Sequence, residues 1–413
     1  MSADSLQTPG VRGNVILRNA PFRRLWLARS ASHLGDGASL IALLLYVKQI
    51  EHAGISVAIL LLAQSIPHLM GPLFGAAVDR FDLKWLMIGC EFTQAVIFAG
   101  LAWWLPGFPI LITTVVVASV LDTMFGPASN SLIPALVEGP DLMQANAWVG
   151  SSLNLQVAIG PLLGGLLVTT LGVRAGLAAN ALSFAISAAC LVGIPRILRG
   201  VSASPPNLRR ASIEGLVFAW KTPVVRAVVL GAFLVVAFAA VDNIALVFLT
   251  RDLLHSSALG FGVVAAAFGI GMLIASTGLS WRRSMPHPAA LVLVGWLLTG
   301  AGTLATGLAG NLVTAGGMQI LAGVGNGIDN VAVATVIQRA VPPPMLGRVF
   351  GLFGSAAFAG STAAYILAGL LLDATSPRVA FVVGGVGVIG SVLLIGPLLW
   401  HAAASTSGPA GSE

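Results

Sequence analysis

Charged side chains are scarce in this sequence. Asp, Glu, Lys and Arg make up 9% of its 413 residues, whereas soluble domains carry about 25%. Hydrophobic residues make up 57%, and the mean hydropathy is +0.94. So few charges cannot cover a water-exposed surface, which excludes a soluble globular protein. We therefore expect an all-α integral membrane protein whose exterior faces membrane lipid.

Cysteine is almost absent, and the motifs of common enzymes are missing. Cys90 and Cys190 both fall inside apolar runs, so the sequence offers neither a disulfide framework nor metal-ligand spacing. It has no phosphate-binding Gly-rich loop and no nucleophile elbow. The formal net charge of +6 comes from basic residues near the ends of apolar runs, a pattern of membrane topology rather than of nucleic-acid binding. We expect no enzyme activity, no cofactor, no metal and no nucleic-acid partner.

Apolar runs long enough to cross a bilayer recur along the whole chain. A spanning helix needs about 20 such residues. Cutting the sequence at charges, Pro and Gly clusters predicts twelve spans near residues 24–50, 55–78, 85–105, 109–137, 143–170, 173–195, 225–249, 258–281, 289–309, 311–338, 349–372 and 378–400.

The basic residues indicate how these spans are oriented. Of the 21 Lys and Arg residues, all but Lys48, Arg174, Arg251 and Arg378 fall at ends assigned to the cytoplasm. The positive-inside rule then predicts cytoplasmic termini in a multi-pass cell-membrane protein. The predicted organisation is a cytoplasmic segment 1–23, a six-helix half 24–195, a cytoplasmic linker 196–224, a second six-helix half 225–400 and a cytoplasmic tail 401–413.

The two halves echo each other in sequence. "GAAVDRFDLK" follows the second span, and "GLSWRRSMPH" follows the eighth. "GPLLGGLLV" in the fifth span has a counterpart, "AYILAGLLLD", in the eleventh at nearly the same offset. A constant offset predicts two parallel repeats around an axis normal to the membrane.

These features resemble the major facilitator superfamily over residues 20–400. Its drug and siderophore exporter branch is similar at "HLGDGASLIALLLYV" in the first span, "FGPASNSLIPALV" in the fourth, "GPLLGG" in the fifth and "VIQRAVPPPMLGRVFGLFGS" across the loop before the eleventh. The resemblance implies the major facilitator fold of two six-helix pseudo-repeats. It also implies a secondary active transporter that exports an amphipathic small molecule, such as a drug, an antibiotic or a siderophore, in exchange for protons.

The resemblance assigns roles to two motifs. The loop after the second span would form a conformational latch through Gly75, Asp79, Arg80 and Lys84; the alternative is an anchor that only fixes topology at the interface. The fifth span would carry an export motif through Gly160, Pro161, Gly164 and Gly165; the alternative is a kink with close helix packing and no bearing on direction.

Four carboxylates lie deep inside predicted spans, where one charge costs about 2.5–3.5 kcal/mol even on lenient insertion scales. We interpret them as candidates for proton coupling or cation binding: Asp36, Asp122, Asp242 and Asp329. Arg29 and His33 share a helical face with Asp36 by their spacing, which makes them relay candidates. For Asp36 the alternative is a packing residue paired with a neighbouring helix, and for His33 a core histidine with satisfied hydrogen bonds is the favoured interpretation. Glu91, near the end of its span, is expected to reach the interface.

Polar residues beside these carboxylates predict a cavity near the middle of the membrane. The cavity candidates are Gln64, His68, Asn243 and Asn330. An importer or facilitator of a small metabolite remains the alternative to an exporter, and a receptor that moves no solute is a third interpretation. The sequence leaves the substrate, the choice of proton or sodium and the oligomeric state open, although a monomer is compatible with it.

Overall fold

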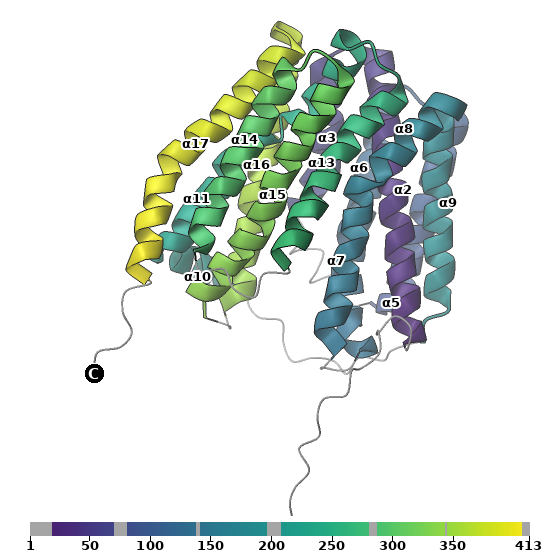
Figure 1. Ribbon diagram of the computed structural model, residues 1–413. Helices are drawn as coiled ribbons and strands as arrows, with labels where there is room; N and C mark the ends of the chain where they lie inside the picture. Colours follow the sequence, from purple (N-terminus) through teal and green to yellow (C-terminus); the bar gives the residue numbers. More distant parts are fainter. Residues whose placement is uncertain are drawn as a thin grey trace, which may run out of the picture.

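The computed structural model describes residues 19–69, 81–137, 141–195, 208–280, 287–342 and 345–406. Within these ranges the chain folds into helices and contains no strand (Figure 1). Eleven helices in the described ranges are long and apolar enough to cross a membrane. The predicted second span is represented by a shorter apolar helix that ends where the gap at 70–80 begins. The all-helical membrane fold predicted from the sequence is confirmed.

The first half contains the predicted spans one to six. Its helices are α2 (Ala20–Glu51), α3 (Gly54–Leu69), α5 (Leu83–Trp104), α6 (Phe108–Leu136), α7 (Leu142–Ala158), α8 (Gly160–Leu171) and α9 (Val173–Val192). The fifth span is divided into α7 and α8 at Ile159. The division has a local cause, because Pro161 has no N–H to donate to the carbonyl of Val157.

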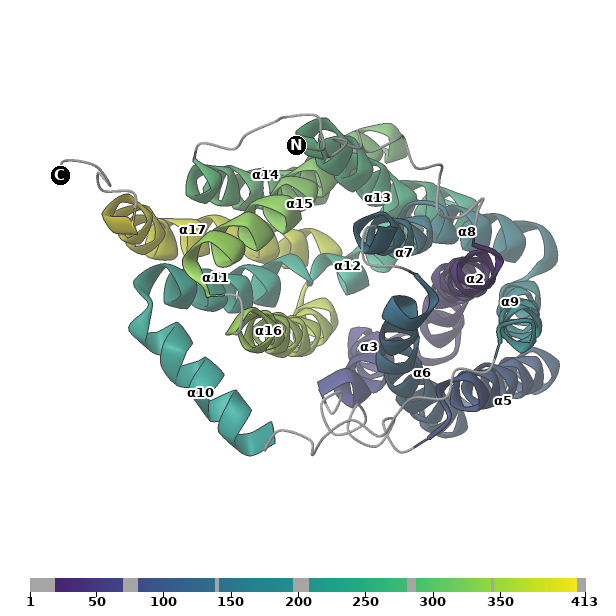
Figure 2. The same cartoon turned by 90° about the horizontal axis from the view of Figure 1, so that it is seen from below.

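The second half contains the predicted spans seven to twelve. Its helices are α11 (Pro223–Ala239), α12 (Asp242–Phe248), the π-helical turn η2 (Leu249–Leu253), α13 (Ala258–Ser280), α14 (Pro288–Leu308), α15 (Leu312–Ala340), α16 (Leu346–Ala374) and α17 (Pro377–Thr406). The helix α10 (Leu208–Lys221) connects the halves, within the residues predicted to form the linker. Figure 2 shows it lying along the outside of α11 and α16.

The apolar cores show how the halves meet. At the end of the bundle that contains Lys48, the Lys48 end, one buried core includes Val47 and Leu60 of the first half together with Phe248 and Phe261 of the second. At the opposite end, which contains α10, the described residues form two separate cores. One lies around Phe22, Leu25 and Met87 in the first half, and the other lies around Val225, Trp296 and Ile337 in the second half. The halves are thus joined by apolar packing at the Lys48 end.

Candidate functional site

A cavity of about 480 Å³ lies between the two halves. This volume is in the range of small-molecule sites, about 300–1,000 Å³. Its walls come from α2, α3, α7 and α8 on one side and from α11 to α16 on the other. Apolar side chains such as Leu40, Ile41, Phe261 and Phe268 form much of the surface, and Asp242 is the one carboxylate among the described residues that line it. The cavity therefore offers a single negative group in largely apolar surroundings.

Asp242 sits at a break in the seventh span. The helix α11 ends at Ala239, and α12 begins with Asp242 in its first turn. The Nε2 amide of Gln319, a fully buried residue of α15, donates to both carboxylate oxygens of Asp242 at 2.9 and 2.8 Å. Such interrupted helices often form the midplane sites of transporters. Gln319 fixes the carboxylate in position and leaves its remaining lone pairs for a ligand.

Other polar cavity walls come from both halves. Gln64, a predicted cavity residue, and Gln156 face the cavity from the first half. Asn243, also predicted, lines it from the second half, and its Nδ2 lies 3.4 Å from the hydroxyl of Tyr365. Uncharged donors and acceptors of this kind orient a bound molecule without fixing its charge.

Asp36 lies beside this cavity rather than in its wall. The next residue, Gly37, lines the cavity, while the Asp36 carboxylate accepts a hydrogen bond from Asn180 Nδ2 of α9 at 3.2 Å. Asn180 is fully buried and donates also to Ser39 at 2.8 Å. Asp36 is therefore placed one residue from the cavity and is held by a neighbouring helix.

The two relay candidates contact other helices than Asp36 does. Arg29 is buried and donates to Ser129 Oγ at 2.8 Å and to Asn130 Oδ1 at 2.9 Å, both on α6. His33 faces Gln156 of α7. The spacing places Arg29, His33 and Asp36 on one face of α2, but their side chains contact three different helices, α6, α7 and α9.

Asp122 and His68 form a pair between α6 and α3. The Nε2 atom of His68 lies 3.1 Å from Asp122 Oδ2, and its Nδ1 atom lies 2.9 Å from the carbonyl oxygen of Gln64. Both ring nitrogens face acceptors, so the imidazole can carry a proton on each of them. The pair can therefore take up one proton beyond the one that a neutral imidazole carries. The ring also stacks on Phe358 of α16, with centroids 5.9 Å apart. The pair therefore touches the opposite half directly.

Asp329 and Asn330 are not among the described residues that line the cavity, and Asn330 is exposed. Asp329 is beside the indole of Trp296, and its Oδ1 atom has no hydrogen-bond partner in the described part of the chain. Asn330 donates to Asn326 Oδ1 at 3.0 Å, and Asn326 lines the cavity. Asn330 thus contacts a residue of the cavity wall, whereas Asp329 is beside Trp296, which is not a lining residue.

Two other predictions concern the α10 end of the first half. Of the four latch residues, Gly75, Asp79 and Arg80 lie outside the described residues. Lys84 donates from Nζ to the carbonyl of Val192 at 2.9 Å, which ties the start of α5 to the end of α9. The expectation that Glu91 reaches the interface is wrong: it is 1% exposed and faces hydroxyl groups of α2 and α9. Packing by α9 covers this position, which periodicity alone does not reveal.

The glycines of α8 bring two neighbours close. A Cβ atom on Gly160 would lie 2.6 Å from the Cα atom of Gly37 on α2, so only glycine fits there. On another side of α8, a Cβ atom on Gly165 would lie 3.1 Å from the Cα atom of Gly262 on α13, across the boundary between the halves. Gly164 packs on Ala38, and Pro161 also lines the cavity. The motif thus makes two close helix contacts, one with α2 in its own half and one with α13 in the other half.

Polar contacts close the Lys48 end. Lys48 Nζ pairs with Asp252 Oδ1 at 2.5 Å. The carboxylate of Asp373, in the last turn of α16, accepts from the backbone N–H groups of Gly54 at 2.6 Å and Ile55 at 3.2 Å. The acid of one half thus caps the first turn of α3 in the other half. Sequence reasoning missed Asp373, Gln319 and Asn180, because each is defined by a partner far away in the chain.

Comparisons with known proteins agree with this architecture. The sequence profile of a family described as transmembrane secretion effector matches residues 14–405. An uncharacterized MFS-type transporter, YfiS, of Bacillus subtilis is 27% identical over 90% of this chain and 92% of its own. Macrolide efflux protein A of Streptococcus pyogenes is 23% identical over 92% and 95% of the two chains. The multidrug efflux pump Tap of Mycobacterium tuberculosis is 25% identical over 84% and 86%.

Among solved structures, the fold is similar to that of a nucleoside transporter. The crystal structure of the nucleoside transporter NupG superposes with a TM-score of 0.73 at 14% identity. The match covers 92% of this chain and 98% of the other. At this identity the likeness concerns the fold alone.

Proposed function

This chain belongs to the transmembrane secretion effector family of the major facilitator superfamily, and we propose that it exports amphipathic small molecules in exchange for protons. The family is one of multi-pass membrane transporters that act on small molecules, not of enzymes. The observation that carries the proposal is the cavity between the halves, with one carboxylate in an apolar lining. Relatives described as macrolide and multidrug efflux proteins support the outward direction.

The preferred substrate is an amphipathic cation. Phe261, Phe268 and the aliphatic residues of α2 supply apolar contact area, and Asp242 supplies the one charge. A cation that leaves water for this cavity needs a charge partner, because burying an unpaired charge is strongly unfavourable. A neutral molecule of the same shape gains only the apolar contacts and the amide hydrogen bonds.

The structure corresponds, in this proposal, to a state that is closed to the outside. The excess of Lys and Arg at the α10 end assigns that end, both termini and the linker to the cytoplasm of the cell membrane. The shared core, the Lys48–Asp252 pair and the Asp373 cap then lie at the outer end. Two separate cores at the cytoplasmic end fit halves that part there. Substrate would load from the cytoplasm and leave after the halves rock.

Proton coupling rests on the acids of the first half. Asp36 lies one residue from the cavity wall, and the Asp122–His68 pair touches Phe358 of the second half. A proton held at either place changes the charge beside the cavity, and the rocking of the halves changes the side from which that proton exchanges. Asp36 is the proposed coupling residue, and Asp122 with His68 links the protonation state to the position of α16.

Efflux from cells that lack their native exporters tests the substrate class. We expect cationic amphipathic dyes to leave such cells when this chain is expressed, and an uncoupler to stop their efflux. Asp242→Asn should slow cation efflux about tenfold, the value of one charge-assisted contact, while neutral amphipathic dyes are unaffected. Asp242→Glu, which keeps the charge, is the matched control and should retain part of the activity. Equal cation efflux by Asp242→Asn and the parent contradicts a cation site.

Proteoliposomes with imposed gradients test the coupling. A proton gradient should drive uphill transport by the parent, whereas Asp36→Asn should lose uphill transport and keep downhill exchange of bound substrate. The amide keeps the volume and the contact with Asn180, so a loss of uphill transport alone reports on the proton. Parental uphill transport by Asp36→Asn refutes the role of Asp36. Transport driven by sodium alone refutes proton coupling, and net uptake driven by the gradient favours the importer.

A further inference from the structure

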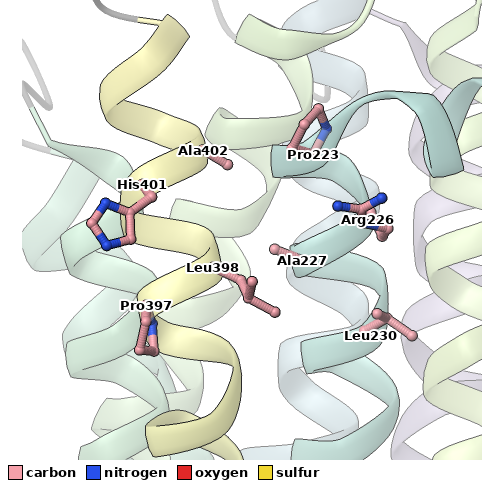
Figure 3. A pocket seen from close by; sticks show the side chains of 8 residues that line it. All are labelled: Pro223, Arg226, Ala227, Leu230, Pro397, Leu398, His401 and Ala402. Carbon is pink, nitrogen blue, oxygen red and sulfur yellow. The ribbon is translucent and has the colours of Figure 1, made fainter.

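A second cavity lies on the surface of the second half, at the α10 end. It has a volume of about 360 Å³ and lies between α11 and α17. Figure 3 shows Ala227 of α11 and Leu398 of α17 pointing toward each other across the gap between the two helices. Leu398 is 53% exposed, so this cavity opens at the surface of the bundle and not into the transport cavity.

Two residues with basic side chains line the cavity, Arg226 of α11 and His401 of α17. In Figure 3 the imidazole ring of His401 points away from α11, so Arg226 is the basic group on the α11 side of the gap. The Arg226 guanidinium donates to the backbone carbonyl of Trp220 at 3.3 Å, and its central carbon lies 5.9 Å from the centroid of the Trp220 ring. Within the residues that the structure describes, Arg226 forms no ion pair with a carboxylate. A guanidinium has five N–H donors, so this one is held in place with donors left for an anion.

The position of the cavity selects the kind of anion. It lies along the first two turns of α11, which begins at Pro223, and near the end of α17. Trp220, in the last turn of α10, and Trp400, near the end of α17, are 59% and 50% exposed. Exposed Trp is enriched at the boundary between membrane and water, so these two mark the level of the lipid headgroups. Below that level the exposed apolar surface of α17, including Leu393 and Leu394, faces the hydrocarbon.

We propose that this cavity binds the phosphate headgroup of an anionic phospholipid from the leaflet at the α10 end. Arg226 holds the phosphate, and the apolar floor of Ala227, Leu230 and Leu398 receives the glycerol and the start of the acyl chains. Basic pockets between spanning helices are known to bind such headgroups. A soluble phosphate compound has no acyl chain to pack on the apolar floor. A lipid without net charge would neutralise the guanidinium only in part.

Native mass spectrometry of the detergent-purified full chain, titrated with phosphatidylglycerol, tests the proposal. Arg226→Gln should weaken binding of the first lipid about fivefold, the effect of one basic residue near a membrane surface. Arg226→Lys should keep most of the binding. Leu398→Trp fills the gap without altering charge and should weaken binding to a similar extent. Arg339→Gln is the matched control, since Arg339 is exposed at the same end and does not line the cavity; it should bind like the parent.

Several outcomes of the same titrations would refute the proposal. Parental binding by Arg226→Gln removes the guanidinium from the site, and an equal loss in Arg339→Gln shows a general effect of charge. Phosphatidylcholine binding as tightly as phosphatidylglycerol refutes the anionic selectivity. Glycerol 3-phosphate displacing the lipid at equal concentration points to a soluble ligand instead of a membrane lipid. A folded state is confirmed for each variant by its elution as a single species.

Discussion

The cap that Asp373 places on α3 predicts how the closed Lys48 end can be loosened. The first N–H groups of a helix have no partner within the helix, and Asp373 accepts from those of Gly54 and Ile55. Because Asp373 belongs to the other half, this contact exists only while the two halves meet. Removing it should therefore shift the equilibrium between the two states and leave the fold intact, since water can hydrate these two N–H groups once the halves part.

The size of the shift follows from the contact. Replacing a capping side chain by Ala costs about 0.5–2 kcal/mol, and the charge at a helix N-terminus adds about 0.3–1 kcal/mol to the contact. Asp373 is exposed, so we expect about 1 kcal/mol for Asp373→Ala, a shift of about fivefold in the ratio of the two states. Asp373→Asn keeps an acceptor and should shift the ratio less.

Distances between two spin labels at the Lys48 end measure this ratio. Trp103 and Val313 are each 85% exposed and belong to different halves, so Trp103→Cys and Val313→Cys in a background without native cysteines suit the purpose. Asp373→Ala should raise the ratio of the long-distance to the short-distance population about fivefold. Glu51→Ala removes another exposed acid from this end and is the control. An unchanged distribution in Asp373→Ala, or the same change in Glu51→Ala, refutes the reasoning.

Three further predictions concern packing and topology. Gly160→Ala should lower the melting temperature in detergent, because its Cβ overlaps the backbone of α2 and overpacking costs about 1–3 kcal/mol; Gly150→Ala, with open space around it, should not. Asn180→Leu should lower the melting temperature as well, because it leaves buried polar groups without a partner at about 1–3 kcal/mol each, and a parental value contradicts this. An impermeant thiol reagent added to whole cells should label His255→Cys and not Lys221→Cys, and the reverse pattern overturns the orientation.

Hydropathy was sufficient to predict the helical architecture, since lipid requires long apolar runs whatever their partners are. The bend at Pro161 was also readable, because a missing N–H acts locally. The break before Asp242 was not, as "AFAAVDN" contains neither Pro nor Gly. There the geometry depends on contacts with other helices, among them the bond from Gln319.

The candidate site shows the same division. The intramembrane acids stand out in the sequence because charge is rare there, and Asp242 and Asn243 do line the cavity. Which acid lies in the wall and which does not depends on how each helix is rotated about its axis. Asp329 and Asp242 differ in this respect, although each is followed by Asn. Rotation is set by packing between helices and has no local signal in the sequence.

The glycine contacts of α8 bear on the speed of the transport cycle. Gly165 and Gly262 bring backbone against backbone between the halves, and beside them the backbone N–H of Leu259 donates to Thr169 Oγ1 at 2.7 Å. Parting such surfaces breaks many weak contacts of about 0.1–0.2 kcal/mol each, but no side chain has to leave one rotamer and find another. Re-forming them likewise immobilises no side chain, so it avoids the ordering cost of about 0.5–1 kcal/mol for each Leu or Ile. At these two glycines the halves can therefore separate and meet again without any side chain being reordered.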